Sequence, residues 1–372
     1  MQDAAVRRFR FVGLLTVGAV YLLILVGGIV RSTGSGMGCP DWPKCFGTWV
    51  PPTHISQLPA NYKEVYTAQR VAKNQKLART LQKLGFKQVA GEIFNHPTQY
   101  IETDFNPVKT WIEYVNRLLG ALIGIFVFLT VVFALPYWRR DATIFWLAFA
   151  SFILTGVQGW LGSLVVSTNL LPVMVTIHMA LALVIVAILL YAVDRARCGR
   201  GNTVPAFQPS IPAHAPQSYT GLQFGIWVLL LLTFVQILLG TQVREEIDMV
   251  SAAVGYTGRE NWIARLGHVF NWHRTFSAIV LLANVYVGYQ VWQLAQRRLQ
   301  RLVGATMSLI ALEILAGFIL AGFALPAAVQ PIHLTLATII FGTQFLLLLG
   351  VGELRKASQM PDSQGAPQRV VA

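Results

Sequence analysis

The chain has 372 residues, of which 55% are hydrophobic, and only 29 Lys or Arg and 16 Asp or Glu carry a formal charge. This is about half of the ~25% charged fraction that is usual in soluble domains, so part of the surface must face something other than water, and lipid is the obvious partner. The high apolar content also excludes a disordered chain, and three Cys are too few for a disulfide-dense fold.

Long uncharged stretches predict the membrane-spanning helices, because about 20 apolar residues are needed to cross a bilayer. The first half of the chain has four such stretches: 11–30, 118–135 and two within 142–193, which break near Leu171-Pro172. The second half also has four: 218–243, 275–295 and two within 302–352, which break near Leu325-Pro326. The sequence therefore predicts an all-α integral membrane protein with eight transmembrane helices.

The basic residues orient these helices, since short cytoplasmic loops collect Lys and Arg. Placing the N-terminus inside puts most border Arg on the cytoplasmic side, so we expect both termini to be cytoplasmic. A cleaved signal peptide at 1–30 is an alternative, but its apolar run is longer than a typical h-region of about 7–15 residues. The net charge of +13 does not indicate a nucleic-acid partner, because most basic residues outside the 31–108 loop lie at membrane borders and contact lipid.

The two halves of the chain repeat one another. EYVNRLLGALIG aligns with VFNWHRTFSAIV, which pairs Asn116-Arg117 with His273-Arg274, and a second alignment pairs His178 with His333. The ends of the first and fifth spans match through Arg31 and Arg244. We therefore expect two pseudo-symmetric four-helix bundles. Their bounds are 1–193, with the long outer loop 31–108, and 218–352, joined by a cytoplasmic linker at 194–217 and followed by a tail at 353–372.

This repeat places Asn116, His178, His273 and His333 at similar depth, each near the start of a helix that enters from the outer side. His273 and His333 on alternate helices could bind the two faces of a haem iron. Three arginines could serve its propionates: Arg31, Arg244 and Arg274. The alternative is that both histidines are hydrogen-bonded packing residues. A zinc site is disfavoured because no third ligand lies at this depth. Covalent attachment of haem is excluded because the sequence has no Cys-x-x-Cys-His motif.

The first half differs from the second at two positions. It has Glu113 where the second has Phe270, and Asn116 where the second has His273. A haem held by His178 alone would keep an open iron face, as oxygen chemistry requires. Glu113 could instead be a carboxylate that complements the helix dipole and pairs with Arg117 at i+4.

Three further features leave alternatives open. Cys39 and Cys45 lie on the outer side, where they could form a structural disulfide over the mouth of the first bundle or a redox-active pair. The stretch 61–86 is basic with helically spaced apolar residues, typical of an amphipathic helix on the membrane or bundle, or of a solvated helix. Glu313 could be a hydrogen-bonding group inside its bundle or part of a proton path.

The chain resembles the haem A synthase family over about residues 10–352. The resemblance rests on GGIVRSTGSGMGCPDWPKC, on Ile112–Tyr114 with Arg117, and on the histidine positions 178, 273 and 333 in a duplicated eight-helix chain. It implies oxidation of the C8 methyl of haem O to a formyl group through a hydroxylated intermediate, which yields haem A. It also implies that the protein lies in the bacterial inner membrane.

The resemblance further implies roles for particular residues. The substrate haem would lie in the first half at His178, with Asn116 and Arg117 beside it and Glu113 in catalysis. Haem b would lie in the second half, with His273 and His333 on its iron, and Cys39 would pair with Cys45. Haem O synthase and an electron donor, a quinol or a ferredoxin, would be partners. The family usually has a second His at position 116, so we expect His178 to be the sole strong protein ligand of the substrate.

Two other functions share these features. One is a haem-b electron carrier that passes quinol electrons, and the other is a haem transport or insertion protein. Neither calls for a carboxylate such as Glu113 on the ligand face of only one bundle.

Overall fold

The computed structural model describes residues 2–95, 104–198 and 219–359. Within these ranges, eight helices are long and apolar enough to cross a membrane, as predicted, so the chain is a multi-pass membrane protein. They are α1 (Gln2–Ser32), α4 (Pro107–Ala134), α5 (Ala142–Ser167), α6 (Pro172–Cys198), α7 (Tyr219–Ala253), α8 (His268–Trp292), α9 (Arg297–Gly322) and α10 (Val329–Ser358). The described ranges contain no strand, and their short 3-10 helices are Ile55–Gln57, Leu135–Tyr137, Arg259–Asn261 and Ile263–Arg265.

Most of the helices run past the uncharged stretches that predicted them. The first begins at Gln2 rather than at residue 11, and the fifth continues to Ala253 rather than ending at 243. The physical reason is that charge marks only the edge of the hydrocarbon, whereas backbone hydrogen bonding along a helix can continue into the interfacial layer.

Both predicted breaks occur, and they have the same backbone form. Asn169 and Leu170 have φ of 53° and 62°, and Ala324 and Leu325 have φ of 54° and 58°. Two successive residues in the left-handed region reverse the chain sharply between antiparallel helices. Pro172 then opens α6, where its missing N–H costs nothing.

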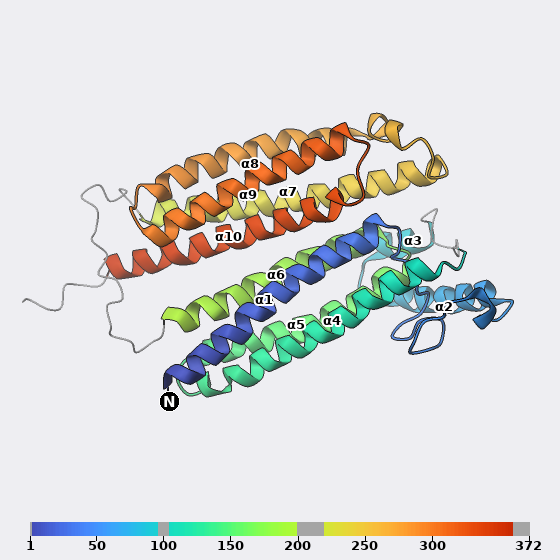
Figure 1. Ribbon diagram of the computed structural model, residues 1–372, viewed down its shortest axis with the longest axis horizontal. Coiled ribbons are helices and arrows are strands. Elements are labelled where there is room, and N and C mark those ends of the chain that lie inside the picture. Colours follow the sequence, from blue (N-terminus) through green and yellow to red (C-terminus); the bar gives the residue numbers. More distant parts are fainter. Residues whose placement is uncertain (1, 96–103, 199–218, 360–372) are drawn as a thin grey trace, which may run out of the picture.

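The eight helices form two rings of four (Figure 1). In each ring, consecutive helices pack together and the first helix also packs on the last, so α1 contacts α4 and α6, and α7 contacts α8 and α10. The rings meet where α10 packs on α1 and α6, and where α6 packs on α7. Every helix therefore presents one side to a four-helix core, as expected for a duplicated bundle.

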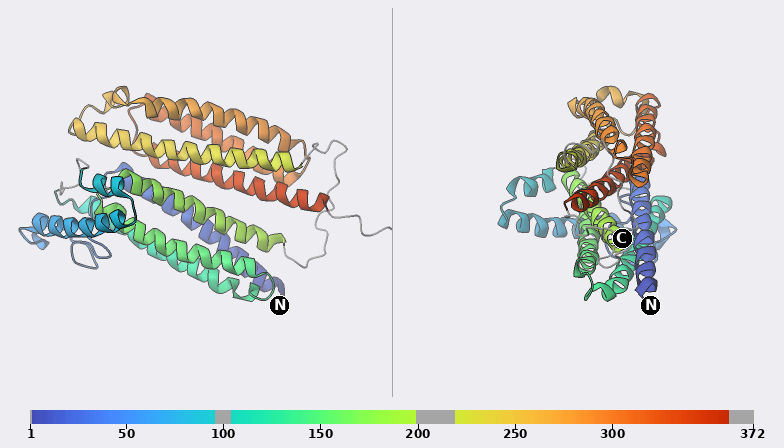
Figure 2. Two further views of the ribbon diagram at one scale, coloured as in Figure 1. Left: turned by 180° about the vertical axis from the view of Figure 1, so that it is seen from behind. Right: turned by 90° about the vertical axis from the view of Figure 1, so that its left-hand side faces the viewer.

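The start of α1 and the end of α10 lie at one end of the molecule, and α2 and α3 lie at the other (Figures 1 and 2). At the first end, Asp194 of α6 binds Arg298 of α9 at 2.5 Å and Arg197 at 3.2 Å. Both arginines also bind Glu353 of α10, at 3.5 and 3.3 Å, so this cluster ties the rings together. The first residues of the predicted linker (194–217) and of the predicted tail (353–372) instead continue α6 to Cys198 and α10 to Ser358. The rest of both segments, from 199 and from 360, lies outside the described residues.

The segment between α1 and α4 packs on the first ring through α2 (Tyr62–Lys83), which α3 (Lys87–Asn95) follows. Lys73 donates to the carbonyl of Ser163 at 3.3 Å, and Asn74 donates to that of Ser167 at 2.9 Å, both on α5. The segment therefore forms a helix that packs on the bundle, one of the predicted alternatives, but its buried face is not the predicted apolar one. It buries mostly polar and aromatic residues at a four-residue spacing: Tyr62, Tyr66, Arg70, Asn74 and Ala78.

Candidate functional site

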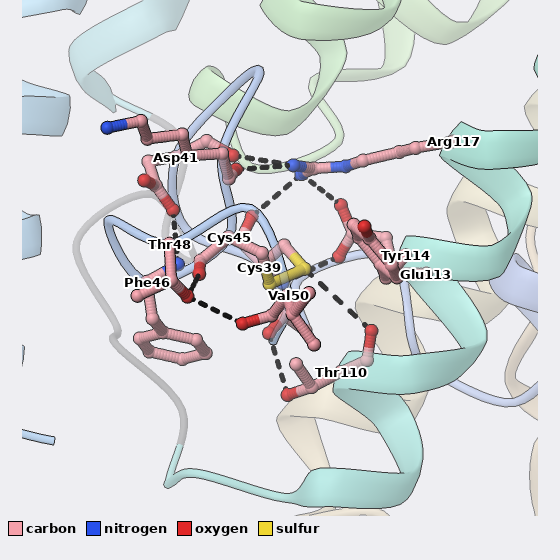
Figure 3. The surroundings of a disulfide bond; sticks show 12 residues. Cys39, Asp41, Cys45, Phe46, Thr48, Val50, Thr110, Glu113, Tyr114 and Arg117 are labelled. Atoms are coloured by element: carbon pink, nitrogen blue, oxygen red, sulfur yellow. Dashed lines mark hydrogen bonds and ion pairs between the residues drawn. A yellow bond between two sulfur atoms is a disulfide. The ribbon is translucent and has the colours of Figure 1, made fainter. Parts of the chain in front are cut away.

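Glu113 lies in the second turn of α4, directly beneath the disulfide loop (Figure 3). Cys39 and Cys45 are bonded to each other, as predicted, and neither is exposed. Glu113 is only 3% exposed, and its Oε2 accepts a hydrogen bond of 2.8 Å from the backbone N–H of Cys39. Thr110, one turn earlier, donates to the carbonyl of Gly38 at 2.9 Å. The loop is therefore tied to α4 at the carboxylate and one turn before it.

Arg117 completes this arrangement by binding both the carboxylate and the loop (Figure 3). Its guanidinium lies 2.5 Å from Oε1 of Glu113, in the i+4 pairing that the sequence left as an alternative. It also donates to the carbonyls of Cys39, Asp41 and Lys44, at 2.9, 2.6 and 3.0 Å. The side chain expected beside the substrate thus holds the loop, and both oxygens of Glu113 have partners.

The loop has its own internal order. Both carboxylate oxygens of Asp41 accept backbone N–H groups, from Phe46 at 2.6 Å and Gly47 at 2.9 Å. Burial and the charge of Asp41 raise the pKa of the Tyr66 hydroxyl on α2. Burial and the guanidinium of Arg117 likewise lower the pKa of Lys73, so the covering helix lies within the electrostatic reach of the loop.

The second ring places His273 of α8 and His333 of α10 opposite each other. Their ring centroids lie 6.4 Å apart, with an angle of 77° between the ring planes. A metal about 2 Å from one nitrogen of each ring requires about 6 Å between the centroids, so the pair fits an iron bound between them. Within the described ranges, no three His, Cys, Asp or Glu side chains could together hold a metal ion. A two-histidine haem centre is the metal site that this geometry fits.

The first ring has weaker candidate ligands for a haem iron than the second. Nδ1 of His178 and Oδ1 of Asn116 are buried polar atoms without a hydrogen-bond partner in the part of the chain that the structure describes. Buried polar atoms are usually satisfied, so unpaired ones at this depth are consistent with a bound group. His178 and Asn116 are therefore the residues of this ring that could hold a bound group.

The arginines expected at the propionates have other partners in the structure. Arg31 of α1 and Arg244 of α7 both bind the carboxylate of Asp248, at 3.0 and 2.7 Å. Arg244 also binds the amide oxygen of Gln330 on α10. The side chain of Arg274 is exposed and lies over the ring of Phe270, 5.9 Å from its centroid.

Asp248, which was not predicted, joins the two rings through Arg31 of α1 and Arg244 of α7. A signal for it was present in the sequence, since Arg244 and Asp248 stand at the i+4 spacing of a helical ion pair. Gln158 and Gln236 were not predicted either; they donate to the backbone carbonyls of His178 and His273 at 2.9 and 3.0 Å.

Comparison with known proteins adds relatives of named function. The chain is 27% identical over 241 residues to a haem A synthase of Bradyrhizobium sp. (strain ORS 278), an alignment that covers 62% of this chain and 54% of the relative. It is 29% identical over 252 residues to a haem A synthase of Rhodopseudomonas palustris (strain BisB5), covering 65% and 58%. The chain thus spans somewhat more than half the length of these relatives.

A family model covers far more of the chain. The cytochrome oxidase assembly protein family COX15-CtaA matches residues 10–87 and 86–345, which include the disulfide loop, Glu113 and all three inward histidines. This match extends across both rings and the outer segment between α1 and α4. The chain therefore belongs to the COX15-CtaA family of cytochrome oxidase assembly proteins.

Proposed function

We propose that the protein is a haem A synthase, which oxidises the C8 methyl of haem O to a formyl group through a hydroxylated intermediate. Membership of the COX15-CtaA family and the haem A synthases among its relatives support this proposal. The observation that carries it is the difference between the rings. Glu113 is buried in the first ring, on the same helix as Asn116, whereas the second ring has two histidines opposite each other and Phe270 at the position equivalent to Glu113.

This difference divides the work between the rings. His273 and His333 would hold haem b, which supplies one-electron transfer when it is bound. His178 would bind the iron of haem O from one side, and Asn116 would leave the other side weakly occupied. The electron donor would be a quinol or a ferredoxin, and haem O synthase would supply the substrate in the bacterial inner membrane.

Glu113 would serve as the proton acceptor of the first ring. It stands three residues before Asn116, so both side chains lie on one face of α4. The N–H of Cys39 and the guanidinium of Arg117 fix the carboxylate in place, and the loop above it excludes water. A positioned base of this kind contributes about 10²- to 10⁴-fold to a rate.

Mass spectrometry of extracted haem tests the proposal. Cells that make haem O are compared with and without this protein, and with a His178→Ala variant at equal membrane abundance. We expect haem A, with some hydroxylated intermediate, only with the wild-type chain. A haem-b electron carrier or a haem insertion protein would leave haem O unchanged, and that result would reject the synthase.

A further inference from the structure

Each of the three inward histidines packs against a glycine of the preceding helix. A Cβ built on Gly162, Gly240 or Gly317 would lie 3.6, 3.3 or 3.5 Å from the Cε1 atom of His178, His273 or His333, respectively. The preceding helix therefore passes directly alongside the same edge of each imidazole ring. The similar distances indicate that one structural element, a glycine packed against the imidazole ring, occurs three times.

The residue four positions before the glycine belongs to the same element. Gln158 and Gln236 donate from Nε2 to the backbone carbonyls of His178 and His273. Because i and i+4 lie on one helix face, each glutamine and its glycine contact the same histidine. The element is thus Gln-x-x-x-Gly on the helix before the ligand.

At His333 the glutamine is replaced by Glu313. Glu313 and His333 follow Gln158 and His178 by the same 155 residues, so the four positions are equivalent in the repeat. The carboxylate does not reproduce the bond to the backbone: its Oε1 lies 3.1 Å from Nδ1 of His333. Only 18% of the Glu313 side chain is exposed, so solvent screens the contact little.

The fourth equivalent position in the repeat, between α1 and α4, lacks both the polar residue of the element and the histidine. Arg31 and Arg244 align, which makes Leu23 the counterpart of Gln236 and Gly27 that of Gly240. The residue on the facing helix there is Asn116 rather than a histidine, and a Cβ on Gly27 would meet no atom within 4 Å. The polar residue of the element is therefore present at the three histidines and absent where the histidine is absent.

We propose that Glu313 is a positioning residue of the haem b site, which accepts the Nδ1–H of His333, directs Nε2 to the iron and lowers the reduction potential of haem b. A carboxylate on the outer nitrogen of a ligating histidine fixes its tautomer and makes it a stronger donor. The negative charge favours ferric over ferrous iron for the one electron that the haem exchanges. This inference rests on the proposed function, because it takes the second ring to hold haem b.

A redox titration of the purified full-length protein, followed by the haem b absorption at one fixed pH, tests this role. Glu313→Gln installs the residue that the repeat has at 158 and 236, and Glu353→Gln is the control that removes a carboxylate at the far end of α10. We expect Glu313→Gln to keep a low-spin haem b with a higher midpoint potential, and Glu353→Gln to keep the wild-type value. An unchanged potential in Glu313→Gln overturns the proposal.

A second variant decides the case in which Glu313→Gln does not hold haem b. Glu313→Asp keeps the charge, so it should bind haem b again with a potential near the wild-type value. If it too lost haem b, the role would be one of packing and the proposal would fail. The titration measures haem b itself, so it tests the role of Glu313. Failure of the synthase proposal would instead appear as absence of haem A from the extracts, so the two failures are distinguishable.

Discussion

The backbone N–H of Cys39 donates a hydrogen bond of 2.8 Å to the carboxylate of Glu113, which joins the disulfide loop to the proposed base. The guanidinium of Arg117 binds the same carboxylate and three loop carbonyls. The loop and the proposed base are therefore one unit. A substitution that moves the loop also moves the carboxylate. Removal of the carboxylate leaves the guanidinium of Arg117 with only loop carbonyls as partners.

The first prediction concerns Glu113→Gln. The amide keeps the shape of the side chain but cannot accept a proton, so we expect haem A formation to fall by about 10²- to 10⁴-fold. The second ring is untouched, and the haem b spectrum should remain. Haem extraction and an absorption spectrum of the same membranes measure the two effects. Loss of the haem b spectrum in this variant would contradict the division of work between the rings.

Glu113→Ala serves as the harsher comparison. It removes one partner of a buried ion pair and leaves Arg117 without its carboxylate, which typically costs about 3–5 kcal/mol. We therefore expect lower membrane abundance for alanine than for glutamine, and activity is compared per mole of haem b.

The second prediction separates a structural from a redox-active disulfide. Replacing Cys39 and Cys45 by Ser removes a cross-link that closes a short loop, worth roughly 2 kcal/mol. Arg117 still binds three carbonyls of that loop, so we expect at most about a tenfold loss of haem A formation, with easier proteolysis between residues 33 and 53. A loss as complete as that of Glu113→Gln would indicate that the thiols take part in the chemistry.

Much of the fold could be predicted because the bilayer imposes it. Gaps between charges mark the spans, and Leu171-Pro172 and Leu325-Pro326 mark the reversals within the two long apolar stretches. The ends of the helices could not be predicted, since the aqueous interface permits polar residues to continue a helix. The placement of His273 and His333 opposite each other followed from helix register, which a repeat preserves.

Other parts of the site depend on contacts that no local pattern contains. The acceptors of Arg117 are backbone carbonyls, and any residue could supply them. Asp248 of α7 meets Arg31 of α1 across a sequence separation of 217 residues, a contact between the two rings that spacing alone does not predict. Glu313 was noted in the sequence, but its partner depends on how α9 and α10 pack.

The third prediction concerns Asn116→His. An imidazole here would restore the histidine that the second ring has at 273, and a Cβ on Gly27, the repeat counterpart of Gly240, meets no atom within 4 Å. We expect haem O bound to this variant to give a low-spin spectrum in addition to that of haem b. We also expect the variant to oxidise haem O more slowly, because both iron faces are then occupied. Spectra of the loaded protein and single-turnover product analysis measure this. Activity well above wild type would mean that Asn116 is a defect rather than the source of the open face.

The fourth prediction concerns the two acidic residues that join the rings. Asp248→Asn leaves Arg31 and Arg244 without a shared carboxylate at one end of the helices. Asp194→Asn leaves Arg197 and Arg298 at the other end with only the carboxylate of Glu353. Partly exposed pairs of this kind contribute modestly, so we expect each variant to lose about 1–2 kcal/mol of stability. Thermal unfolding of the detergent-solubilised protein measures this loss.

Only the outer variant should also change the haem b site. Arg244 stands one turn after Gly240, which packs on His273, and it binds Gln330, three residues before His333. Release of Arg244 from Asp248 therefore alters the packing beside both proposed ligands, whereas Asp194 lies at the opposite end of the helices. We expect Asp248→Asn to broaden or shift the haem b absorption band and Asp194→Asn to leave it unchanged. Equal spectra for the two variants, at equal loss of stability, would show that the outer cluster only holds the rings together.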